Sequence, residues 1–329
     1  MSPRLLLLLP LLLLGLASPL VHGAWASETT VAQREIDQQE LFVFEEGGAR
    51  FDVTVERGPR RATRAGIEGW LRAAARAVAG LHGRFPVPQV RVVVKPGGTS
   101  RDPVIFGQAV RREEERLDLI LCRTATDDEL PGEWIAIHEM THLAFPRIDR
   151  TDAWINEGFV TYYQEVLRTR AGFQSEPEGW GMLADGFARG ATRGSGRSLA
   201  EESRLMQRTH GYWRVYWGGA AMALDMDLEL RRRTGGKRTL DDVVTWWWRA
   251  FGARRGATRG LELIDAADRW LGAAILRPLA DRHLARVEFA DVRELFGRIG
   301  LAPRGNDVVY LDQGPLIRER TRIMRPGGR

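Results

Sequence analysis

The order of the secondary-structure patterns constrains the fold of this chain more than any other feature. Strand-like alternation of apolar and polar residues fills residues 41–57 and 89–122, and a helical pattern spans residues 64–85 between them. From residue 134 onward the spacing is mostly helical, apart from a strand-like segment at residues 307–316. Strands that precede helices, without regular alternation, are typical of an α+β fold. We therefore expect a small N-terminal mixed sheet with helices, followed by a mostly helical lobe.

The helical part is divided by loops. Helical spacing predicts helices at residues 153–169, 212–236, 240–252 and 260–276, and we expect a Gly- and Ser-rich connection at residues 171–197. Internal repeats are absent from the sequence. We divide the chain after its N-terminal segment into a sheet-rich part, residues 27–130, and a second part of the same domain, residues 131–329.

Residues 1–26 have the pattern of a secretory signal peptide. Arg4 precedes a leucine-rich run, and the sequence A-W-A at residues 24–26 has the form expected before a cleavage site. Cleavage there would start the mature chain near Ser27 and would place the protein in the periplasm or outside the cell. An uncleaved N-terminal anchor is the alternative. After this region no segment reaches the roughly 20 apolar residues of a membrane span.

Charge and cysteine content exclude several classes. Of 48 basic residues only Lys95 and Lys237 are lysines, and the formal net charge is +5. The arginines are scattered and alternate with acids, which is typical of a solvated surface of mixed sign, so we expect no nucleic-acid partner. The lone cysteine, Cys122, cannot form an internal disulfide. Its apolar neighbours predict a buried thiol without a catalytic role.

The stretch W-I-A-I-H-E-M-T-H-L-A-F, residues 134–145, contains the residues with the clearest chemical pattern. On a helix, His138 and His142 project from one face about one turn apart, so both imidazoles can reach one Zn²⁺. Glu139 lies beside them and can take a proton from a metal-bound water, as in the H-E-x-x-H arrangement. The alternative is a helix with one core histidine and one exposed histidine.

A two-histidine site needs a third protein ligand, and Glu157 is the candidate. It lies in the apolar and aromatic run W-I-N-E-G-F-V-T-Y-Y, residues 154–163, where an unpaired carboxylate would be costly to bury. A metal ion removes that cost, and two histidines with one glutamate leave a position open for water. The alternative is an ordinary acid near the start of a helix.

These two motifs together resemble the gluzincin metallopeptidases, the group that contains thermolysin and aminopeptidase N. In that group the glutamate of N-E-G is the third zinc ligand, so the resemblance implies one zinc held by His138, His142 and Glu157. Residues 216–244 are similar to the corresponding part of the glycyl aminopeptidases, and by that alignment Tyr216 is the tyrosine that stabilises the oxyanion. The resemblance implies a thermolysin-like catalytic domain.

The chain departs from that pattern at three places. Fourteen residues, 143–156, separate His142 from Glu157, which is fewer than usual, so the loop between the two helices must be short. Gly218 stands where the family has lysine. The segment F-G-Q-A-V, residues 106–110, takes the place of the G-x-M-E-N motif and lacks its acid, so aminopeptidase specificity stays open.

The roles that follow are those of a zinc peptidase. Glu139 is the predicted general base, and Tyr216 is the first choice for the oxyanion donor, with His210 as the alternative and Tyr212 as a third option. Thr161 is one turn after Glu157, where it is either a second partner of a ligand histidine or a plain helix threonine.

We therefore expect an exported, bacterial zinc metallopeptidase that acts on a peptide or protein substrate, with aminopeptidase activity as one form of this function. Two alternatives come from other classes. One is a catalytically idle protein of the same fold that binds a cell-envelope partner or peptide. The other is a globular protein without enzymatic activity, in which the H-E-M-T-H stretch is incidental. The sequence does not indicate an oligomeric state.

Overall fold

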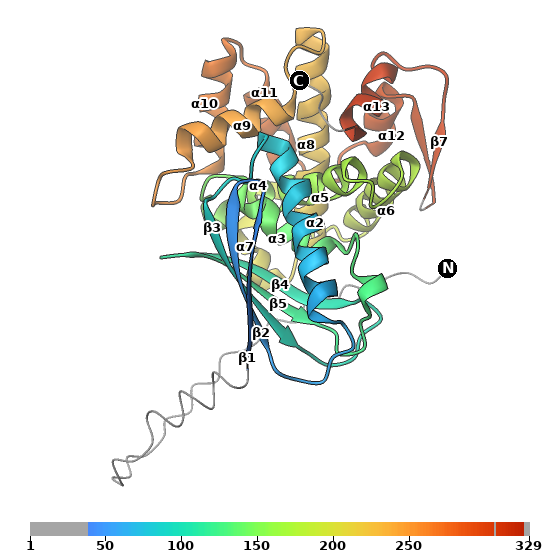
Figure 1. Cartoon of the computed structure of the whole chain (residues 1–329). Coiled ribbons are helices and arrows are strands. Elements are labelled where there is room, and N and C mark those ends of the chain that lie inside the picture. Colours follow the sequence, from blue (N-terminus) through green and yellow to red (C-terminus); the bar gives the residue numbers. More distant parts are fainter. Residues whose placement is uncertain (1–38, 306, 326–329) are drawn as a thin grey trace, which may run out of the picture.

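A computed structural model describes residues 39–305 and 307–325, so the expected signal peptide lies outside the described residues. Figure 1 shows a twisted sheet on one side of the molecule and a group of helices on the other, as expected for an α+β fold. Among the described residues, no helix combines the length and the apolar character that crossing a bilayer requires.

The N-terminal sheet has five strands in the order β1-β2-β3-β5-β4. They are β1 (Gln39–Glu46), β2 (Ala49–Glu56), β3 (Gln89–Pro96), β4 (Val104–Arg111) and β5 (Glu115–Leu121). The two inner pairs, β2–β3 and β3–β5, are parallel, and the two outer pairs are antiparallel. The sheet is therefore mixed, as expected, and it leaves β4 at an edge.

Local chemistry explains the first elements. Gly47 and Gly48 have φ values of 59° and 79°, which allow the two-residue turn between β1 and β2. Helix α2 (Arg64–His82) connects β2 to the parallel strand β3. Its N-cap Thr63 accepts a hydrogen bond from the Gly66 amide, and Gly83 ends the helix in the left-handed region with φ of 77°. The predicted helix at residues 64–85 is thus confirmed, with its end at the glycine.

One face of the sheet forms the core beneath α2. Alternate side chains of the three inner strands are at most 2% exposed and face the helices: Phe51, Val53, Val55, Val90, Val92, Val94, Leu117, Leu119 and Leu121. The strict period of two confirms the alternation read from the sequence.

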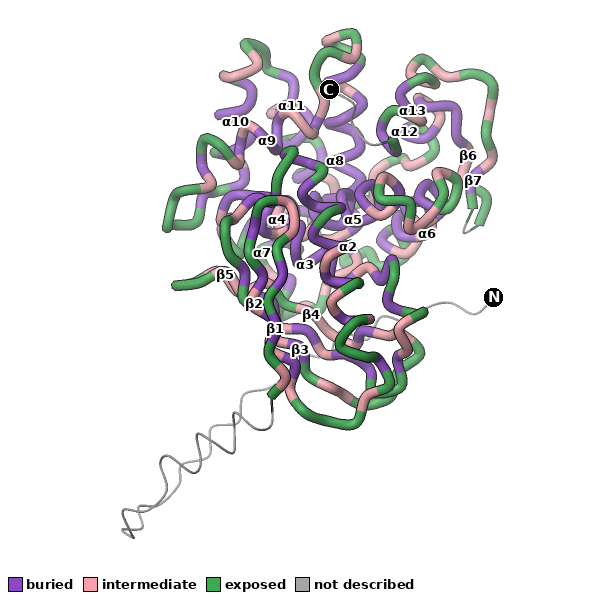
Figure 2. Tube along the Cα trace, viewed as in Figure 1, coloured by how far each residue is buried: buried purple, intermediate pink, exposed green. Residues whose placement is uncertain are grey.

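The rest of the described chain is mostly helical. Its helices are η1 (Asp127–Glu129), α3 (Trp134–Leu143), η2 (Arg150–Asp152), α4 (Ala153–Asn156), α5 (Gly158–Arg170), α6 (Glu176–Ala191), α7 (Leu199–Thr209), α8 (Tyr212–Thr234), α9 (Leu240–Phe251), α10 (Gly260–Leu271), α11 (Leu276–Ala285), α12 (Val292–Arg298) and α13 (Ile317–Met324). A hairpin of β6 (Leu301–Arg304) and β7 (Asp307–Tyr310) interrupts them. In Figure 2 the long buried segments of α5 and α8 run through the middle of this part.

The predicted connection at residues 171–197 is wrong, because most of it is helix α6. Ser175 and Glu178 form a capping box at its start, and Trp180, Leu183 and Phe187 are fully buried at helical spacing. The glycines that suggested a loop instead allow side chains from neighbouring segments to pack directly against the backbone of α6. A Cβ at Gly186, for example, would lie 2.2 Å from the Trp217 ring.

Two boundaries and one further helix also differ from the expectation. The predicted helix at residues 260–276 stops at Leu271, where Gly272 has φ of 70° and ends α10. Helix α7 was not expected, although Ser198 and Glu201 form a capping box at its start. The strand-like segment at the C-terminus is strand only as far as Tyr310.

Candidate metal centre

Helix α3 holds the first two candidate ligands. Its N-terminus is capped by Glu133, whose side chain accepts a hydrogen bond from the Ile135 amide at 2.8 Å. The helix packs against β4 and β5 on one side and against α2 and α5 on others, so most of its side chains are buried. His138 and His142 lie one turn apart, with ring centroids separated by 5.1 Å. Both imidazoles therefore leave the same side of α3.

Glu157 faces the two histidines from the junction of α4 and α5. Its Oε2 atom lies 3.5 Å from His138 Nε2 and 3.4 Å from His142 Nε2. The ligand atoms of the three residues all lie within 4.8 Å of one another. The short loop of residues 144–152 is thus sufficient to bring the two helices face to face, as the sequence spacing required.

The three residues fit a metal ion. Ligand atoms about 2.0–2.1 Å from a tetrahedral Zn²⁺ lie about 3.3 Å from one another, which is close to both histidine–glutamate separations. Burial opposes ionisation of Glu157, yet the contacts with His142 and His138 hold the pKa of Glu157 well below its ordinary value. Burial likewise opposes protonation of His142, but Glu157 raises the pKa of His142. The cluster thus favours a positive charge at its centre, which a divalent cation can supply.

Glu139 is held by the edge strand of the sheet. The Ala109 amide in β4 donates a hydrogen bond to Glu139 Oε2 at 2.7 Å, and the Glu139 side chain is buried. This contact depends on Gly107, because a Cβ there would lie 2.3 Å from Ile135 Cγ2 and 2.8 Å from Glu139 Cγ. The segment F-G-Q-A-V therefore lies directly against α3, the motif helix that carries H-E-M-T-H. A residue with a side chain at position 107 would clash with this helix.

Tyr216, near the start of α8, lies over the other side of the cluster. Its ring is nearly parallel to that of His138, with centroids 6.1 Å apart and an angle of 11° between planes. Burial raises the pKa of Tyr216 well above its ordinary value, and the charges of Glu157 and Glu139 and a hydrogen bond with Glu157 add to this effect. The phenol therefore keeps its proton and can act as a hydrogen-bond donor at the cluster.

A contact between two glycines sets the position of Tyr216. Gly158 in α5 follows Glu157, and Gly219 in α8 is three residues after Tyr216. A Cβ on Gly158 would lie 2.4 Å from the Gly219 Cα, and one on Gly219 would lie 2.0 Å from the Trp154 carbonyl oxygen. The two helices therefore touch backbone to backbone, because neither residue has a side chain.

The alternative donors lie farther away. His210 is exposed and ends α7 with φ of 55°, and its ring is 6.1 Å from that of Tyr212. Tyr212 is itself 6.4 Å from Tyr216, measured between ring centroids, and its hydroxyl donates to Gln207 at 3.0 Å. Thr161 donates to the Glu157 carbonyl oxygen at 2.8 Å, so it is a plain helix threonine. Of the three aromatic candidates, Tyr216 is the one beside the candidate ligands.

Two neighbours of His138 were missed by the sequence reasoning. Gln164 in α5 places its Oε1 atom 2.9 Å from His138 Nδ1. Trp134 packs edge-on against the same ring, with centroids 5.8 Å apart. Gln164 is seven residues after Glu157, which is two helical turns, so this spacing could have placed it on the same side of α5. Its residue type alone gave no signal.

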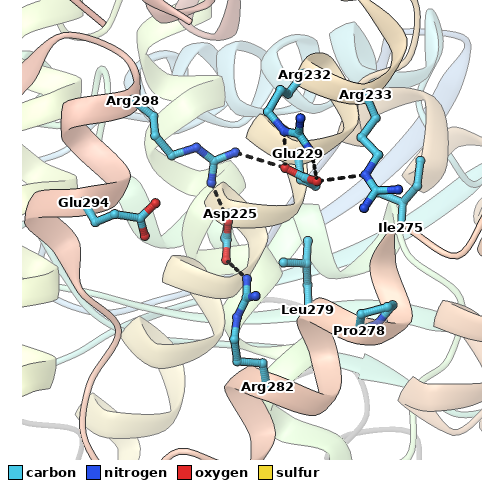
Figure 3. A pocket seen from close by; sticks show the side chains of 10 residues that line it. All are labelled: Asp225, Glu229, Arg232, Arg233, Ile275, Pro278, Leu279, Arg282, Glu294 and Arg298. Atoms are coloured by element: carbon cyan, nitrogen blue, oxygen red, sulfur yellow. Dashed lines mark hydrogen bonds and ion pairs between the residues drawn. The ribbon is translucent and has the colours of Figure 1, made fainter. Parts of the chain in front are cut away.

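A hollow of about 380 Å³ lies elsewhere, between α8, α11 and α12 (Figure 3). It is lined by Asp225, Glu229, Arg232, Arg233, Ile275, Pro278, Leu279, Arg282, Glu294 and Arg298. Arg298 bridges Asp225 at 2.7 Å and Glu229 at 3.4 Å, and Arg282 also contacts Asp225, as the dashed lines in Figure 3 show. The two carboxylates on α8 are thus already neutralised, and the hollow offers neither of them as a free base.

Comparisons with known proteins bear on the fold of the chain. No protein-family model and no curated protein sequence matches the chain. Among solved structures, an aminopeptidase N family protein from Idiomarina loihiensis is similar with a TM-score of 0.64 and 19% identity, over 80% of this chain and 49% of that one. The chain has a gluzincin, aminopeptidase-like fold.

Other structures with this fold come from Deinococcus radiodurans. An M1 zinc metallopeptidase gives a TM-score of 0.54 at 18% identity, over 77% of this chain and 53% of that one. A mutant M1 zinc metallopeptidase from the same organism, bound to a Tyr-Ser-Ala substrate, gives 0.55 at 16% identity, over 81% and 54%. The chain therefore spans about half the length of the gluzincin-fold proteins that it resembles.

Proposed function

We propose that this protein is an exported zinc-dependent peptidase. The observation that carries the proposal is the convergence of His138 Nε2 and His142 Nε2 on one carboxylate oxygen of Glu157, next to a second glutamate and a tyrosine. Two imidazoles and one carboxylate are a standard catalytic zinc set. The fold shared with zinc metallopeptidases supports the same ion and a peptide or protein substrate.

Glu139 is the proposed general base. Bound zinc would lower the pKa of a water towards 7 and polarise the substrate carbonyl. Glu139 Oε2 accepts from Ala109, so the carboxylate is held in a fixed orientation beside the ligands. From there Glu139 takes the proton of the attacking water and delivers it to the leaving amine.

Tyr216 is the proposed donor to the developing oxyanion. Its hydroxyl is protonated at neutral pH, and its raised pKa extends this state to alkaline pH, while its ring lies alongside that of His138. A donor that is already in place gains most when charge develops on the carbonyl oxygen. His210 remains the alternative, and it would have to move towards the cluster to serve.

The position of the cleaved bond within the substrate is a separate question. The β4 segment that touches the motif helix contains Gly107, Gln108 and Ala109 and no acid. An aminopeptidase needs a negative group to hold the free amine of its substrate, and β4 does not provide one. Hydrolysis of matched peptides with free and acetylated N-termini distinguishes the two cases, because an aminopeptidase cleaves only the free form.

Metal analysis with three variants tests the proposal. We expect zinc in stoichiometric amount in the purified protein, and its loss in His138→Ala and Glu157→Ala. Glu139→Gln should retain zinc and lose hydrolysis by about 10²- to 10⁴-fold, because the general base is removed. Zinc without hydrolysis of any peptide library would favour the idle binding protein, and absence of zinc after reconstitution would reject the metal centre.

Export is tested separately. We expect the mature protein to begin near Ser27, because the A-W-A sequence at residues 24–26 precedes it. N-terminal sequencing of the protein from an expressing bacterial host reads this directly. A retained Met1 in a membrane fraction would instead indicate an anchor.

A further inference from the structure

The orientation of His138 is controlled from helix α5. His138 Nδ1 lies 2.9 Å from Gln164 Oε1, and both side chains are buried, with exposures of 4% and 7%. The opposite ring nitrogen, Nε2, faces Glu157. Helix α5 therefore contacts both sides of this imidazole, because Glu157 and Gln164 are two turns apart on it.

A glutamine side chain can form a hydrogen bond with histidine Nδ1 in two orientations, and only one of them leaves the Nε2 lone pair of a neutral ring free to bind a metal. If the Gln164 oxygen faces Nδ1, the proton lies on Nδ1 and the Nε2 lone pair is free for a metal. If the amide is reversed, its NH₂ group faces Nδ1, and a neutral imidazole then carries its proton on Nε2, where it blocks metal binding. Gln164 alone does not decide between these states.

Glu165 fixes the orientation of the Gln164 amide. Gln164 Nε2 donates to Glu165 Oε1 at 2.6 Å, and Glu165 is fully buried. A carboxylate accepts hydrogen bonds and does not donate them, so the NH₂ group of Gln164 must face Glu165. Its oxygen is then left for His138.

Glu165 is itself held firmly. Its Oε2 atom accepts from Arg168 Nη1 at 2.9 Å and from Gln174 Nε2 at 3.0 Å. Arg168 Nε donates in turn to the carbonyl oxygen of Gly132, just before the motif helix, at 3.0 Å. The chain of contacts thus begins at His138 in α3 and returns to the residues that precede α3, which fixes the carboxylate relative to the histidine.

We propose that Glu165 is a positioning residue of the metal centre, which locks the Gln164 amide so that His138 presents its Nε2 lone pair to the metal. The proposal rests on the proposed zinc site and assigns Glu165 no contact with metal or substrate. Partners of this kind affect metal affinity because they fix both the tautomer and the ring orientation of the ligand.

Zinc affinity of three variants, measured by competition with a chelating dye, tests the role. Glu165→Gln leaves a partner that can donate or accept, so the Gln164 amide is free to reverse, and we expect zinc to bind about 10- to 100-fold more weakly. The swapped variant Gln164→Glu with Glu165→Gln restores an obligate acceptor at His138 and should bind within about threefold of the parent. Tyr163→Phe is the control and should bind zinc like the parent, because it removes a part-buried hydrogen bond to Asp241 from the same helix without touching His138 or Gln164.

A second readout separates orientation from general destabilisation. In the zinc-free parent, ¹⁵N NMR should show the proton of the neutral His138 ring on Nδ1, and Glu165→Gln should add the other tautomer. Parent-like affinity in Glu165→Gln, or equal weakening in Glu165→Gln and the swapped variant, would overturn the positioning role. Absence of zinc binding by the parent would instead reject the proposed function itself.

Discussion

In two places in this molecule a histidine Nε2 atom lies next to a buried carboxylate oxygen, but the charged residues around the two carboxylates differ. Asp225, which lines the hollow of Figure 3, receives Arg298 and Arg282 there. His283 Nε2 lies 2.9 Å from the same carboxylate. At the candidate metal centre, two histidines converge on Glu157. Within the described part of the chain, no arginine or lysine forms an ion pair with that carboxylate.

The difference shows what separates a structural ion pair from a candidate metal site. Burial opposes ionisation of Asp225, but hydrogen bonding and charge from His283 and Arg298 lower the pKa of Asp225 to about 2. Two permanent cations of the protein, Arg298 and Arg282, contact this carboxylate. Among the residues that the structure describes, the ion-pair partners of Glu157 are imidazoles, which are neutral ligands when a metal binds. A carboxylate with two histidines and no arginine therefore leaves a place for an external cation.

The largest effect is expected from removing one histidine of each contact. His142→Ala should lose both zinc and measurable hydrolysis, because one ligand of three is absent. His283→Ala should keep stoichiometric zinc and hydrolysis, and lose stability instead. Zinc analysis and peptide hydrolysis on the same preparations check both results. Equal loss of zinc in the two variants would erase the distinction between the contacts.

Asp225→Asn should lower the free energy of unfolding by about 3–5 kcal/mol, because it leaves Arg298 and His283 without their buried partner. Zinc affinity should stay unchanged. Asp281→Asn is the matched control: it removes an exposed pair with Arg277 on α11, which contributes about 0–1 kcal/mol. Urea denaturation of the zinc-free proteins gives both values. A small loss in Asp225→Asn would mean that the arginines are solvated without it.

Gly219→Ala tests whether the close contact of α8 with α4 and α5, near the proposed metal centre, can yield to an added methyl group. The added methyl group meets the Trp154 carbonyl oxygen, so we expect a loss of about 1–3 kcal/mol in stability. Tyr216 should be displaced, so kcat should fall with zinc retained. Gly80→Ala in α2 meets no atom within 4 Å and should be stabilising by up to about 1 kcal/mol. Unchanged kcat in Gly219→Ala would contradict the placement of Tyr216.

Glu133 extends the comparison to a buried carboxyl that forms no ion pair with any residue the structure describes. Burial raises the pKa of Glu133 to about 8, despite the amide of Ile135, and its Oε1 atom has no hydrogen-bond partner. Its folded pKa lies above the ordinary value of 4.5, so its folded form holds a proton that the unfolded chain releases, and stability falls as pH rises between these values. Between about pH 6 and 8 the parent should lose about 2 kcal/mol more than Glu133→Gln. Parallel denaturation curves would contradict this.

The sequence predicted the parts of the fold that local patterns determine. The strands, α2 and the spacing of His138 and His142 follow from periods of two and about 3.6 residues, and the structure confirms these elements. Glu157 could be proposed as the third ligand because a carboxylate in an apolar run needs a charged partner. The roles of these residues in catalysis stay predictions that the experiments above address.

Other features depend on contacts between distant segments. Gln164 has meaning only because α5 packs against α3, and no local pattern shows which polar residue of α5 faces a histidine. Helix α6 was missed because its glycines lower helix propensity, while the burial of Trp180 and Phe187 that stabilises it comes from tertiary packing. The capping box at Ser175 and the helical spacing of Trp180, Leu183 and Phe187 were local signals that could have corrected the prediction.

The contact between Gly158 and Gly219 also has a use in sequence searches. One glycine follows Glu157, the proposed third ligand, and the other lies three residues after Tyr216, more than fifty positions later in the chain. An accidental H-E-x-x-H helix has no reason to be accompanied by both. Because the two backbones touch, we expect both glycines to occur together wherever this arrangement of helices is present. A search that requires both should therefore separate this arrangement from coincidental pairs of histidines.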